Sequence, residues 1–297
     1  MSNVSRKRLG VITGASSGVG WATARALACK GFDLVLVGRN CRRGGALRKH
    51  LERWHPDGRF QFVACDLSNL PSVRHTAELI TKAHPFIDVL INNAGARFDT
   101  FQQSVNGFEL TFATNHLGHF LLTLLLMDSL HRSGAGRVIT VSSRVHRSAS
   151  TETPWLMSFN CYDRKQAYAK SKLANVLFAF ELARRMQGMT VVSNAVEPGV
   201  LATRFARNNG LVAWARHVIP HFLRGELTSV TSAGESMAHL ATSPKLAGIS
   251  GRLFSLGTET AASGEAQDRE AAARLWAESL ECTRSEALRE PVCVRGD

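Results

Sequence analysis

Short apolar runs alternate with longer segments of helical periodicity along almost the whole chain. The apolar runs at 9–13, 33–37, 60–65, 87–91, 137–142 and 190–195 predict six strands, and 251–255 could add a last one. Helical patterns lie at 19–30, 42–54, 72–84, 105–131 (mostly helix), 166–186, 211–224, 229–240 and 270–280. Near-continuous apolar strands separated by helices are typical of a parallel sheet covered on both faces. The pattern therefore predicts an α/β fold with a doubly wound sheet and ligands at the carboxyl ends of its strands.

Length and composition favour one domain. The chain has 297 residues, of which 44% are hydrophobic, enough for one sizeable core. No linker, repeat or low-complexity segment interrupts the pattern. We expect a domain over 1–281 and a loose polar tail over 282–297.

Cysteine usage and hydropathy indicate the compartment. The six cysteines are scattered and form no CxxC pair, which argues against a disulfide framework or a zinc site and fits a reducing compartment. The N-terminal segment 1–9 is short and polar, unlike a signal peptide. The longest apolar stretch, Phe120–Met127, is too short to span a bilayer. We expect a cytoplasmic protein without a transmembrane segment, and Phe120–Met127 as a core helix that could also contact a second subunit.

The net charge of +12 could reflect either a solvated basic surface or a nucleic-acid site. It arises from 28 Arg and 8 Lys spread along the chain without a basic run or an aromatic-interleaved patch. This distribution favours a solvated arginine-rich surface, helpful to an anionic cofactor, over a nucleic-acid site.

A glycine-rich turn follows the first predicted strand. Thr13 is followed by Gly14-Ala15-Ser16-Ser17-Gly18-Val19-Gly20, which leads into a helix. Glycines let the backbone approach a pyrophosphate, whose charge is stabilised at the positive end of the helix dipole. The turn therefore predicts a dinucleotide site on a Rossmann-type sheet, with the spacing GxxxGxG instead of GxGxxG.

The second strand indicates which dinucleotide binds. It ends at Val37-Gly38-Arg39-Asn40 and carries no acid that could hold a ribose 2′-hydroxyl. Arg39, helped by Arg42 or Arg43, can grip a 2′-phosphate as a planar fork. We therefore expect NADP(H).

One tyrosine has a lysine at helical spacing. Tyr168 precedes Lys172 by four residues, so both project from one helix face, whereas the other tyrosine, Tyr162, has a glutamine there. A free phenol has a pKa near 10, and a neighbouring ammonium lowers that pKa toward the working range of a base. Ser142 or Ser143, at the end of the fifth strand, can donate a hydrogen bond to a substrate oxygen.

Together these residues resemble the short-chain dehydrogenase/reductase family over roughly residues 9–280. The motifs that carry the resemblance are the glycine turn, Asn92-Asn93-Ala94-Gly95, Asn115, Ser143, Tyr168-Ala169-Lys170-Ser171-Lys172 and Pro198-Gly199. Asn115-His116-Leu117-Gly118-His119-Phe120, Val141-Ser142-Ser143 and the 25-residue separation of Ser143 and Tyr168 are similar to the branch of retinol dehydrogenases and WW-domain oxidoreductases.

The resemblance implies roles for individual residues. Tyr168 would be the general acid or base, Lys172 would hold the nicotinamide ribose and lower the tyrosine pKa, Ser143 would orient the substrate, and Asn115 would hold a proton-relaying water. The cofactor would contact Gly14, Ser16, Ser17, Gly18, Val19, Gly20, Arg39, Asp66, Leu67, Asn93, Ala94, Gly95, Tyr168, Lys172, Pro198, Gly199, Val200 and Thr203. Ser143 and Tyr168 would contact the substrate.

These expectations describe an NADP-dependent enzyme that moves a hydride between nicotinamide and a carbonyl or alcohol. The apolar segment 211–227 would be a lid over a lipophilic substrate, although its arginines could instead touch a membrane. The alternative is a silent NADP(H)-binding regulatory or scaffold protein. Paired histidines, His116 with His119 and His217 with His221, lack the acids or cysteines of a metal site, so we expect none. The substrate, the direction of reaction and the choice between monomer and homodimer stay open.

Overall fold

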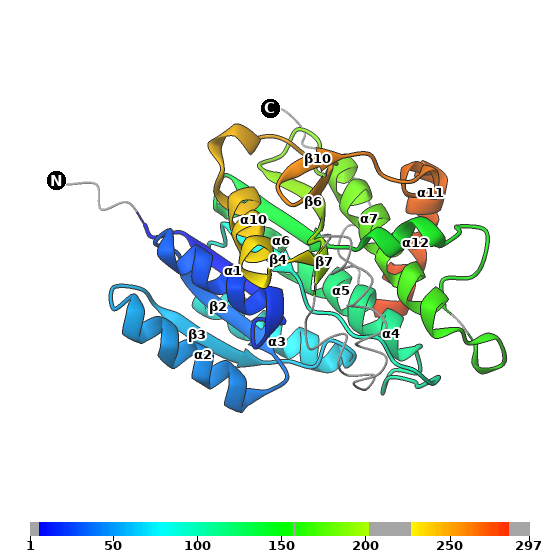
Figure 1. The fold of residues 1–297 in the computed structure, drawn as a ribbon, viewed down its shortest axis with the longest axis horizontal. Helices are drawn as coiled ribbons and strands as arrows, with labels where there is room; N and C mark the ends of the chain where they lie inside the picture. Colours follow the sequence, from blue (N-terminus) through cyan, green and yellow to red (C-terminus); the bar gives the residue numbers. More distant parts are fainter. Residues whose placement is uncertain (1–5, 157, 202–226, 285–297) are drawn as a thin grey trace.

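An eight-stranded sheet runs through the middle of the molecule (Figure 1). The computed structural model describes residues 6–156, 158–201 and 227–284. The sheet order is β10-β9-β6-β5-β4-β1-β2-β3, and every neighbouring pair is parallel except β9 and β10. The strands are β1 (Leu9–Thr13), β2 (Asp33–Gly38), β3 (Phe60–Ala64), β4 (Val89–Asn92), β5 (Gly136–Val141), β6 (Val191–Glu197), β9 (Leu253–Ser255) and β10 (Thr258–Thr260). This confirms the predicted doubly wound parallel sheet.

Helices cover both faces of the sheet, as Figure 1 shows. One face carries α1 (Gly18–Cys29), α2 (Cys41–Trp54) and α10 (Val230–Thr242). The other carries α3 (Leu70–Ala83), α5 (Gly118–Leu125) and α7 (Arg164–Arg185), with α12 (Arg269–Thr283) packed against α7. Shorter helices are α4 (Leu110–Phe112), α6 (Met127–Arg132) and α11 (Gly264–Gln267), and a separate strand pair joins β7 (Val200–Leu201) to β8 (Leu227–Thr228).

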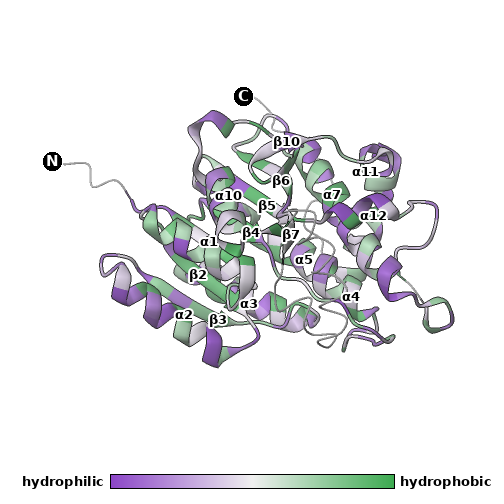
Figure 2. Cartoon of the chain, in the orientation of Figure 1, coloured by the Kyte–Doolittle hydropathy of each residue, from purple (hydrophilic) through white to green (hydrophobic). Residues whose placement is uncertain are grey.

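Alternate residues of each central strand enter different cores. In β2, Val35 and Val37 pack with α3 and α5, whereas Leu34 and Leu36 pack with α1 and α2. All four side chains are buried. Because both faces of the strand are covered, its sequence is an apolar run without alternation. Figure 2 shows the contrast between these hydrophobic strands and the hydrophilic outer side of α2.

The segment expected to be mostly helical from 105 begins later. A tight turn occupies its start, where the backbone N–H of Gly107 donates to the carbonyl of Ser104 (2.9 Å) and Gly107 has φ +83°. Asn106 accepts a hydrogen bond from the backbone N–H of Leu70 (3.0 Å). The prediction was wrong for 105–109 because Asn-Gly favours a turn over a helix. Helical backbone starts at Leu110 and includes a π-helical turn, Ala113–Leu117.

The carboxyl-terminal part adds a hairpin that the sequence analysis missed. Strand β10 pairs antiparallel with β9 through Leu256 and Gly257, both at positive φ, as a two-residue hairpin turn requires. The last helix runs to Thr283, so the expected tail begins inside it and residues 285–297 lie outside the described part. The predicted helix at 211–224 also lies outside it. None of the helices in the described ranges is long and apolar enough to cross a membrane.

The order of the strands determines where a ligand can bind. Strand β1 lies between β2 and β4, so the chain leaves β1 on one side and returns on the other. In such sheets a crevice opens at the carboxyl ends of the strands where the direction of winding changes. The glycine turn follows β1 and Asn93 follows β4, and both lie at this crevice.

Candidate active site

The glycine turn after β1 favours glycine at three of its positions, two because of backbone conformation and one because of space. Gly14 and Gly18 have φ of +67° and +57°, values that favour glycine. A Cβ on Gly20 would lie 2.4 Å from the carbonyl oxygen of Gly14. The N-terminus of α1 is thereby brought close to the end of β1, which leaves the backbone N–H groups around Ser17 suited to an anion.

Thr13 ties this turn to the end of β4. Its hydroxyl accepts hydrogen bonds from the backbone N–H groups of Asn93 (2.9 Å) and Ala94 (3.0 Å). The side chain of Asn93 in turn donates to the carbonyl of Thr13 (2.8 Å). The structure thus brings together two of the motifs predicted to contact the cofactor.

Arg39 lies at the end of β2, where the sequence predicted a selector for the dinucleotide. Its side chain is exposed, and the neighbouring Gly38 lies beside Ser16 of the glycine turn. Asn40 caps α2 by accepting from the backbone N–H of Arg43 (2.9 Å). The position after β2 therefore presents cations and no carboxylate beside the turn.

Asp66 and Leu67 follow β3 on the same edge of the sheet. The Asp66 carboxylate accepts hydrogen bonds from the backbone N–H and the hydroxyl of Ser68 (3.0 and 2.7 Å). Leu67 is buried, and its carbonyl oxygen lies so near Gly118 that a Cβ there would approach to 2.2 Å. Asp66 is thus fixed in orientation, and Leu67 is fixed against α5.

Tyr168 and Ser143 meet at the carboxyl edge of the sheet. Tyr168 lies in the first part of α7, and its hydroxyl is hydrogen-bonded to the side chain of Ser143, which directly follows β5 and Ser142. Ser142 points elsewhere, because its hydroxyl donates to the carbonyl of Lys172 (2.8 Å). The geometry therefore selects Ser143 from the two serines that the sequence left open.

The pKa of Tyr168 differs from the sequence expectation. Part of the residue is exposed, yet the surrounding protein disfavours the charged phenolate and raises the pKa of Tyr168 to about 12. The Arg97 guanidinium and the hydrogen bond from Ser143 oppose this rise. Arg97, in the loop after β4, thus exerts the influence on the phenol that the sequence analysis ascribed to Lys172.

Lys172 lies one helical turn after Tyr168. Its ammonium group is 5.7 Å from the centre of the Tyr168 ring and donates to the carbonyl of Val141 (3.1 Å). The side chain is 3% exposed, and this burial lowers the pKa of Lys172 to about 8. A buried ammonium with one protein acceptor retains two N–H groups for further partners.

Asn115 lies in the π-helical turn and faces the loop after β4. Its side-chain oxygen accepts from the backbone N–H of Ala96 (2.7 Å), and its amide donates to the carbonyl of Ala96 (2.9 Å) and to the hydroxyl of Ser171 (2.9 Å). A Cβ on Gly95 would lie 3.5 Å from both the Asn115 oxygen and the Lys172 nitrogen. Gly95, Asn115 and Lys172 therefore surround one small space.

Pro198 and Gly199 follow β6 on the same edge. Gly199 has φ +83°, and a Cβ on it would lie 2.3 Å from the hydroxyl of Thr228. Val200 begins β7, and only its backbone is described. Thr203 and almost all of the expected lid at 211–227 lie outside the described residues.

The two histidines of the π-turn region are buried and serve packing. His119 bonds Thr13 through one ring nitrogen (2.8 Å) and the Asn115 carbonyl through the other (2.9 Å). His116 bonds Ser279 of α12 (2.9 Å). Burial lowers the pKa of His116 to about 3 and of His119 to about 4, so both are neutral. In the described part of the chain no three His, Cys, Asp or Glu side chains gather as metal ligands would.

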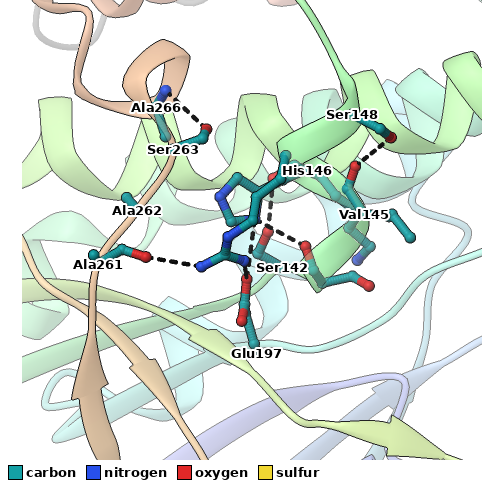
Figure 3. A network of polar contacts seen from close by, with 12 residues as sticks. Ser142, Val145, His146, Ser148, Glu197, Ala261, Ala262, Ser263 and Ala266 are labelled. Atoms are coloured by element: carbon teal, nitrogen blue, oxygen red, sulfur yellow. Dashed lines mark hydrogen bonds and ion pairs between the residues drawn. The ribbon is translucent and has the colours of Figure 1, made fainter.

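The sequence did not reveal that the buried carboxylate of Glu197 lies among polar partners next to Ser143. Glu197, the last residue of β6, contacts His146 and Arg147 of the 3₁₀ turn that follows Ser143, as Figure 3 shows. No motif marks these residues, because Glu197 lies fifty positions from its partners in sequence. The one signal in the sequence is the acid itself, which ends the strand directly after the apolar Ala195 and Val196.

The comparisons with known proteins agree with this geometry. The family model described as short chain dehydrogenase matches residues 9–214. Mouse retinol dehydrogenase 13 is 36% identical over 274 residues, which cover 91% of this chain and 81% of that protein. Mouse polyprenol dehydrogenase is 35% identical over 283 residues, which cover 93% of this chain and 84% of that protein.

A solved structure extends the likeness to the fold. An uncharacterized protein from Mycobacterium paratuberculosis has a TM-score of 0.72 and 32% identity, with 94% of each chain covered. The family model covers well over half of the sequence, and the curated relatives match along nearly all of it. This chain therefore belongs to the short-chain dehydrogenase/reductase family, in its retinol-dehydrogenase-like branch.

Proposed function

We propose that the protein is an NADP(H)-dependent oxidoreductase that interconverts a carbonyl and an alcohol on a mainly apolar substrate. The observation that carries this proposal is the contact of Tyr168 with Ser143 beside the buried Lys172 ammonium. A phenol and a hydroxyl directed at one point can polarise a carbonyl oxygen and deliver a proton to it.

The residues at the crevice fit a dinucleotide. The close approach of Gly20 to Gly14 would let the backbone N–H groups at the start of α1 bind a phosphate. The exposed guanidinium of Arg39 would bind a 2′-phosphate through two parallel hydrogen bonds. Asp66 and Leu67 would line the adenine, Asn93, Ala94 and Gly95 the ribose, and Pro198, Gly199, Val200 and Thr203 the nicotinamide side. When bound, the cofactor supplies or accepts the hydride.

The side chains of this protein then handle the proton. In the reducing direction Tyr168 donates its phenolic proton to the developing alkoxide, while Ser143 donates a hydrogen bond to the same oxygen. Lys172 would bind the ribose hydroxyls through the N–H groups that Val141 leaves available. Asn115, whose side chain contacts Ala96 and Ser171 and whose carbonyl contacts His119, would hold a water that connects Lys172 to solvent.

Several observations support an apolar substrate. Val145 lies two residues after Ser143 and is 40% exposed, and Phe159 is 74% exposed against Phe101 at a ring separation of 5.8 Å. Both segments come after β4 or β5 in the chain, and we expect their side chains to line the substrate site. The curated relatives are named for retinol and polyprenol, which are lipophilic alcohols.

The same proposal places the enzyme in a reducing compartment such as the cytoplasm. Cys29, Cys41, Cys65, Cys161 and Cys282 are all free thiols. Such thiols persist unpaired where glutathione keeps them reduced.

NADPH oxidation by the purified protein across a panel of lipophilic aldehydes and ketones tests the proposal. Turnover with at least one carbonyl, and a lower KM for NADPH than for NADH, is expected. Tight NADPH binding without turnover of any carbonyl or alcohol would indicate the alternative, a silent cofactor-binding protein.

A further inference from the structure

The buried carboxylate of Glu197 is linked to Ser143 through the side chain of His146. The side chain of Glu197 is 2% exposed and that of His146 is 0% exposed. One oxygen of Glu197, Oε1, contacts Nδ1 of His146 at 3.0 Å and a guanidinium nitrogen of Arg147 at 2.5 Å. The other terminal nitrogen of Arg147 donates to the carbonyl of Ala261, after β10 (2.8 Å; Figure 3). The carboxylate therefore joins segments that follow β5, β6 and β10.

The contacts of His146 determine which of its nitrogens carries the proton. Nδ1 lies near two acceptors, Glu197 Oε1 and the carbonyl oxygen of Ser143 (2.9 Å). A nitrogen between two acceptors must be the donor, so Nδ1 is protonated. The backbone N–H of His146 also donates to the carbonyl of Ser143 (3.0 Å). His146 thus donates its backbone N–H to the carbonyl of the serine that touches Tyr168, and its Nδ1–H is shared between that carbonyl and Glu197.

Ser143 needs such support because the sheet no longer holds it. The last ladder-like bond of β5 runs from the N–H of Ser142 to the carbonyl of Val196 (2.7 Å). Glu197 follows Val196 and is itself followed by Pro198 and Gly199. The side chain of Glu197 therefore supports Ser143 through His146. Its backbone leads directly into the loop that is predicted to contact the nicotinamide.

The charges around the carboxylate favour its ionised form. Burial raises the pKa of Glu197 more than any single contact lowers it, but the hydrogen bonds and charges of His146 and Arg147 together bring that pKa below its ordinary value. At neutral pH the carboxylate is thus charged, paired with Arg147 and accepting from His146. A purely structural ion pair would be charged in the same way. A positioning role is therefore indicated by where Glu197 lies, linked through His146 to Ser143.

We propose that Glu197 is a positioning residue, which through His146 and Arg147 holds the Ser143 hydroxyl against Tyr168. This role rests on the proposed function, because a serine needs such alignment only where it orients a reacting group. The side-chain contacts of Glu197 run to His146 and Arg147, and His146 contacts Ser143, so the influence of Glu197 on Tyr168 passes through Ser143.

Tyrosine NMR tests the proposal without requiring turnover. The chain has two tyrosines, so protein labelled with ¹³C at the tyrosine Cζ gives two resonances, which Tyr162→Phe assigns. Ser143→Ala shows how the Tyr168 resonance moves when the serine contact is lost. Glu197→Leu, which removes both acceptor and charge, should move that resonance in the same direction. Glu197→Gln keeps an oxygen acceptor and should move it less.

The matched control is a second carboxylate paired with two arginines. Glu181, near the far end of α7, accepts from Arg184 and Arg185 (2.8 Å each) and is 7% exposed. Glu181→Leu should destabilise the fold and leave the Tyr168 resonance in place. If Glu197→Leu also leaves it in place, or if Glu181→Leu moves it equally, the positioning role is refuted.

Variants of His146 keep the test valid if Glu197→Leu does not fold. His146→Leu removes the donor to Ser143, whereas His146→Asn retains a donor at the δ position. The first should shift the Tyr168 resonance and the second should restore it toward the wild type. Equal shifts in both variants would overturn the proposal.

Kinetics adds a readout that separates this role from the proposed function. With a carbonyl that the wild type reduces, Glu197→Leu should lower kcat roughly 10- to 100-fold, the range for a misaligned group, with little change in NADPH affinity. Glu181→Leu should keep kcat. If no carbonyl is reduced by the wild type, the proposed function fails, while the NMR comparison still decides whether Glu197 positions Ser143.

Discussion

The ammonium group of Lys172 lies 5.7 Å from the centre of the Tyr168 ring, with both residues on one face of α7. The hydroxyl of Tyr168 is hydrogen-bonded to the side chain of Ser143. A cofactor ribose fits the proposed mechanism as the group between Lys172 and Tyr168, because it can accept from the ammonium and donate to the phenol. We therefore expect the ribose to contact both side chains.

Replacing Tyr168 with phenylalanine removes the proton donor and keeps the ring. Turnover should fall by a factor of roughly 10² or more, while NADPH affinity, followed by fluorescence titration, stays near that of the wild type. Tyr162→Phe is the matched control, because the Tyr162 hydroxyl donates to the carbonyl of Phe98 (2.7 Å) and, among the hydrogen bonds of the described residues, makes none to Ser143. Comparable turnover in the two variants would exclude Tyr168 as the acid.

The buried charge of Lys172 should cost stability in the cofactor-free protein. Its pKa is about 8 in the folded state, against 10.5 for a lysine exposed to water, so the unfolded chain holds its proton more tightly. Lys172→Met should therefore raise the free energy of unfolding at pH 7 by on the order of 3 kcal/mol. The carbonyl of Val141 would keep its other partner, the amide of Asn175 (3.0 Å).

The pH dependence of this gain has a definite sign. The penalty is constant below pH 8 and disappears as pH rises through the interval from about 8 to 10.5, so the two proteins should converge in alkaline urea melts. Lys170→Met is the comparison for activity, because Lys170 donates to the carbonyl of Pro154 (2.8 Å) outside the site and its replacement should preserve turnover. Burial lowers the pKa of Lys170 too, so its replacement should also change stability with pH. A less stable Lys172→Met protein at pH 7 would contradict the prediction.

Arg97 should control the pH profile of the reaction. Its positive charge favours the Tyr168 phenolate, so Arg97→Met should raise the pKa of Tyr168. In alcohol oxidation, where the phenolate is the base, the rise of kcat/KM with pH should move to higher pH. Arg164→Met, which loses only the exposed ion pair with Asp99 (2.9 Å), should leave the profile unchanged. A shift toward lower pH in Arg97→Met would disprove this electrostatic role.

Arg39 should select the phosphorylated dinucleotide. Arg39→Ala should weaken NADPH binding about tenfold, or about 1.4 kcal/mol, the low end expected for an exposed charged hydrogen bond, and leave NADH binding almost unchanged. Arg48→Ala serves as the control, because Arg48 pairs with Glu52 on the surface of α2 (2.9 Å). A wild-type preference for NADH would refute the assignment.

Local patterns predicted the sheet and its covering helices, because buried strands such as β2 are apolar on both faces and form continuous apolar runs. The glycine turn and the four-residue spacing of Tyr168 and Lys172 are local as well. What depended on long-range contacts was not predictable. The bond from Tyr168 selects Ser143 over Ser142, and Glu197 meets His146 only when β5 and β6 lie side by side.

The sequence did not predict the electrostatics of the candidate site. The sequence supplied a lysine at the right spacing and suggested that it lowers the tyrosine pKa. In the fold, burial raises the pKa of Tyr168, and the opposing cation is Arg97, which comes from the loop after β4. Desolvation depends on how completely neighbouring segments enclose a group, and no short sequence pattern records that.

The last prediction concerns the substrate. Val145 lies two residues after Ser143, and the exposed Phe159 packs on Phe101. If these side chains line the substrate site, as the proposed function expects, chain extension of a substrate should bury more apolar surface there. Each buried CH₂ contributes about 0.8 kcal/mol, which is about fourfold in kcat/KM. Aliphatic aldehydes of increasing length, measured at saturating NADPH, should therefore show a rising kcat/KM until the crevice is filled. Phe159→Ser should flatten the rise, whereas Trp54→Ser, on the outer side of α2, should preserve it. A flat series in the wild type, or the highest activity with small sugars or charged acids, would reject the apolar substrate and leave the hydride chemistry intact.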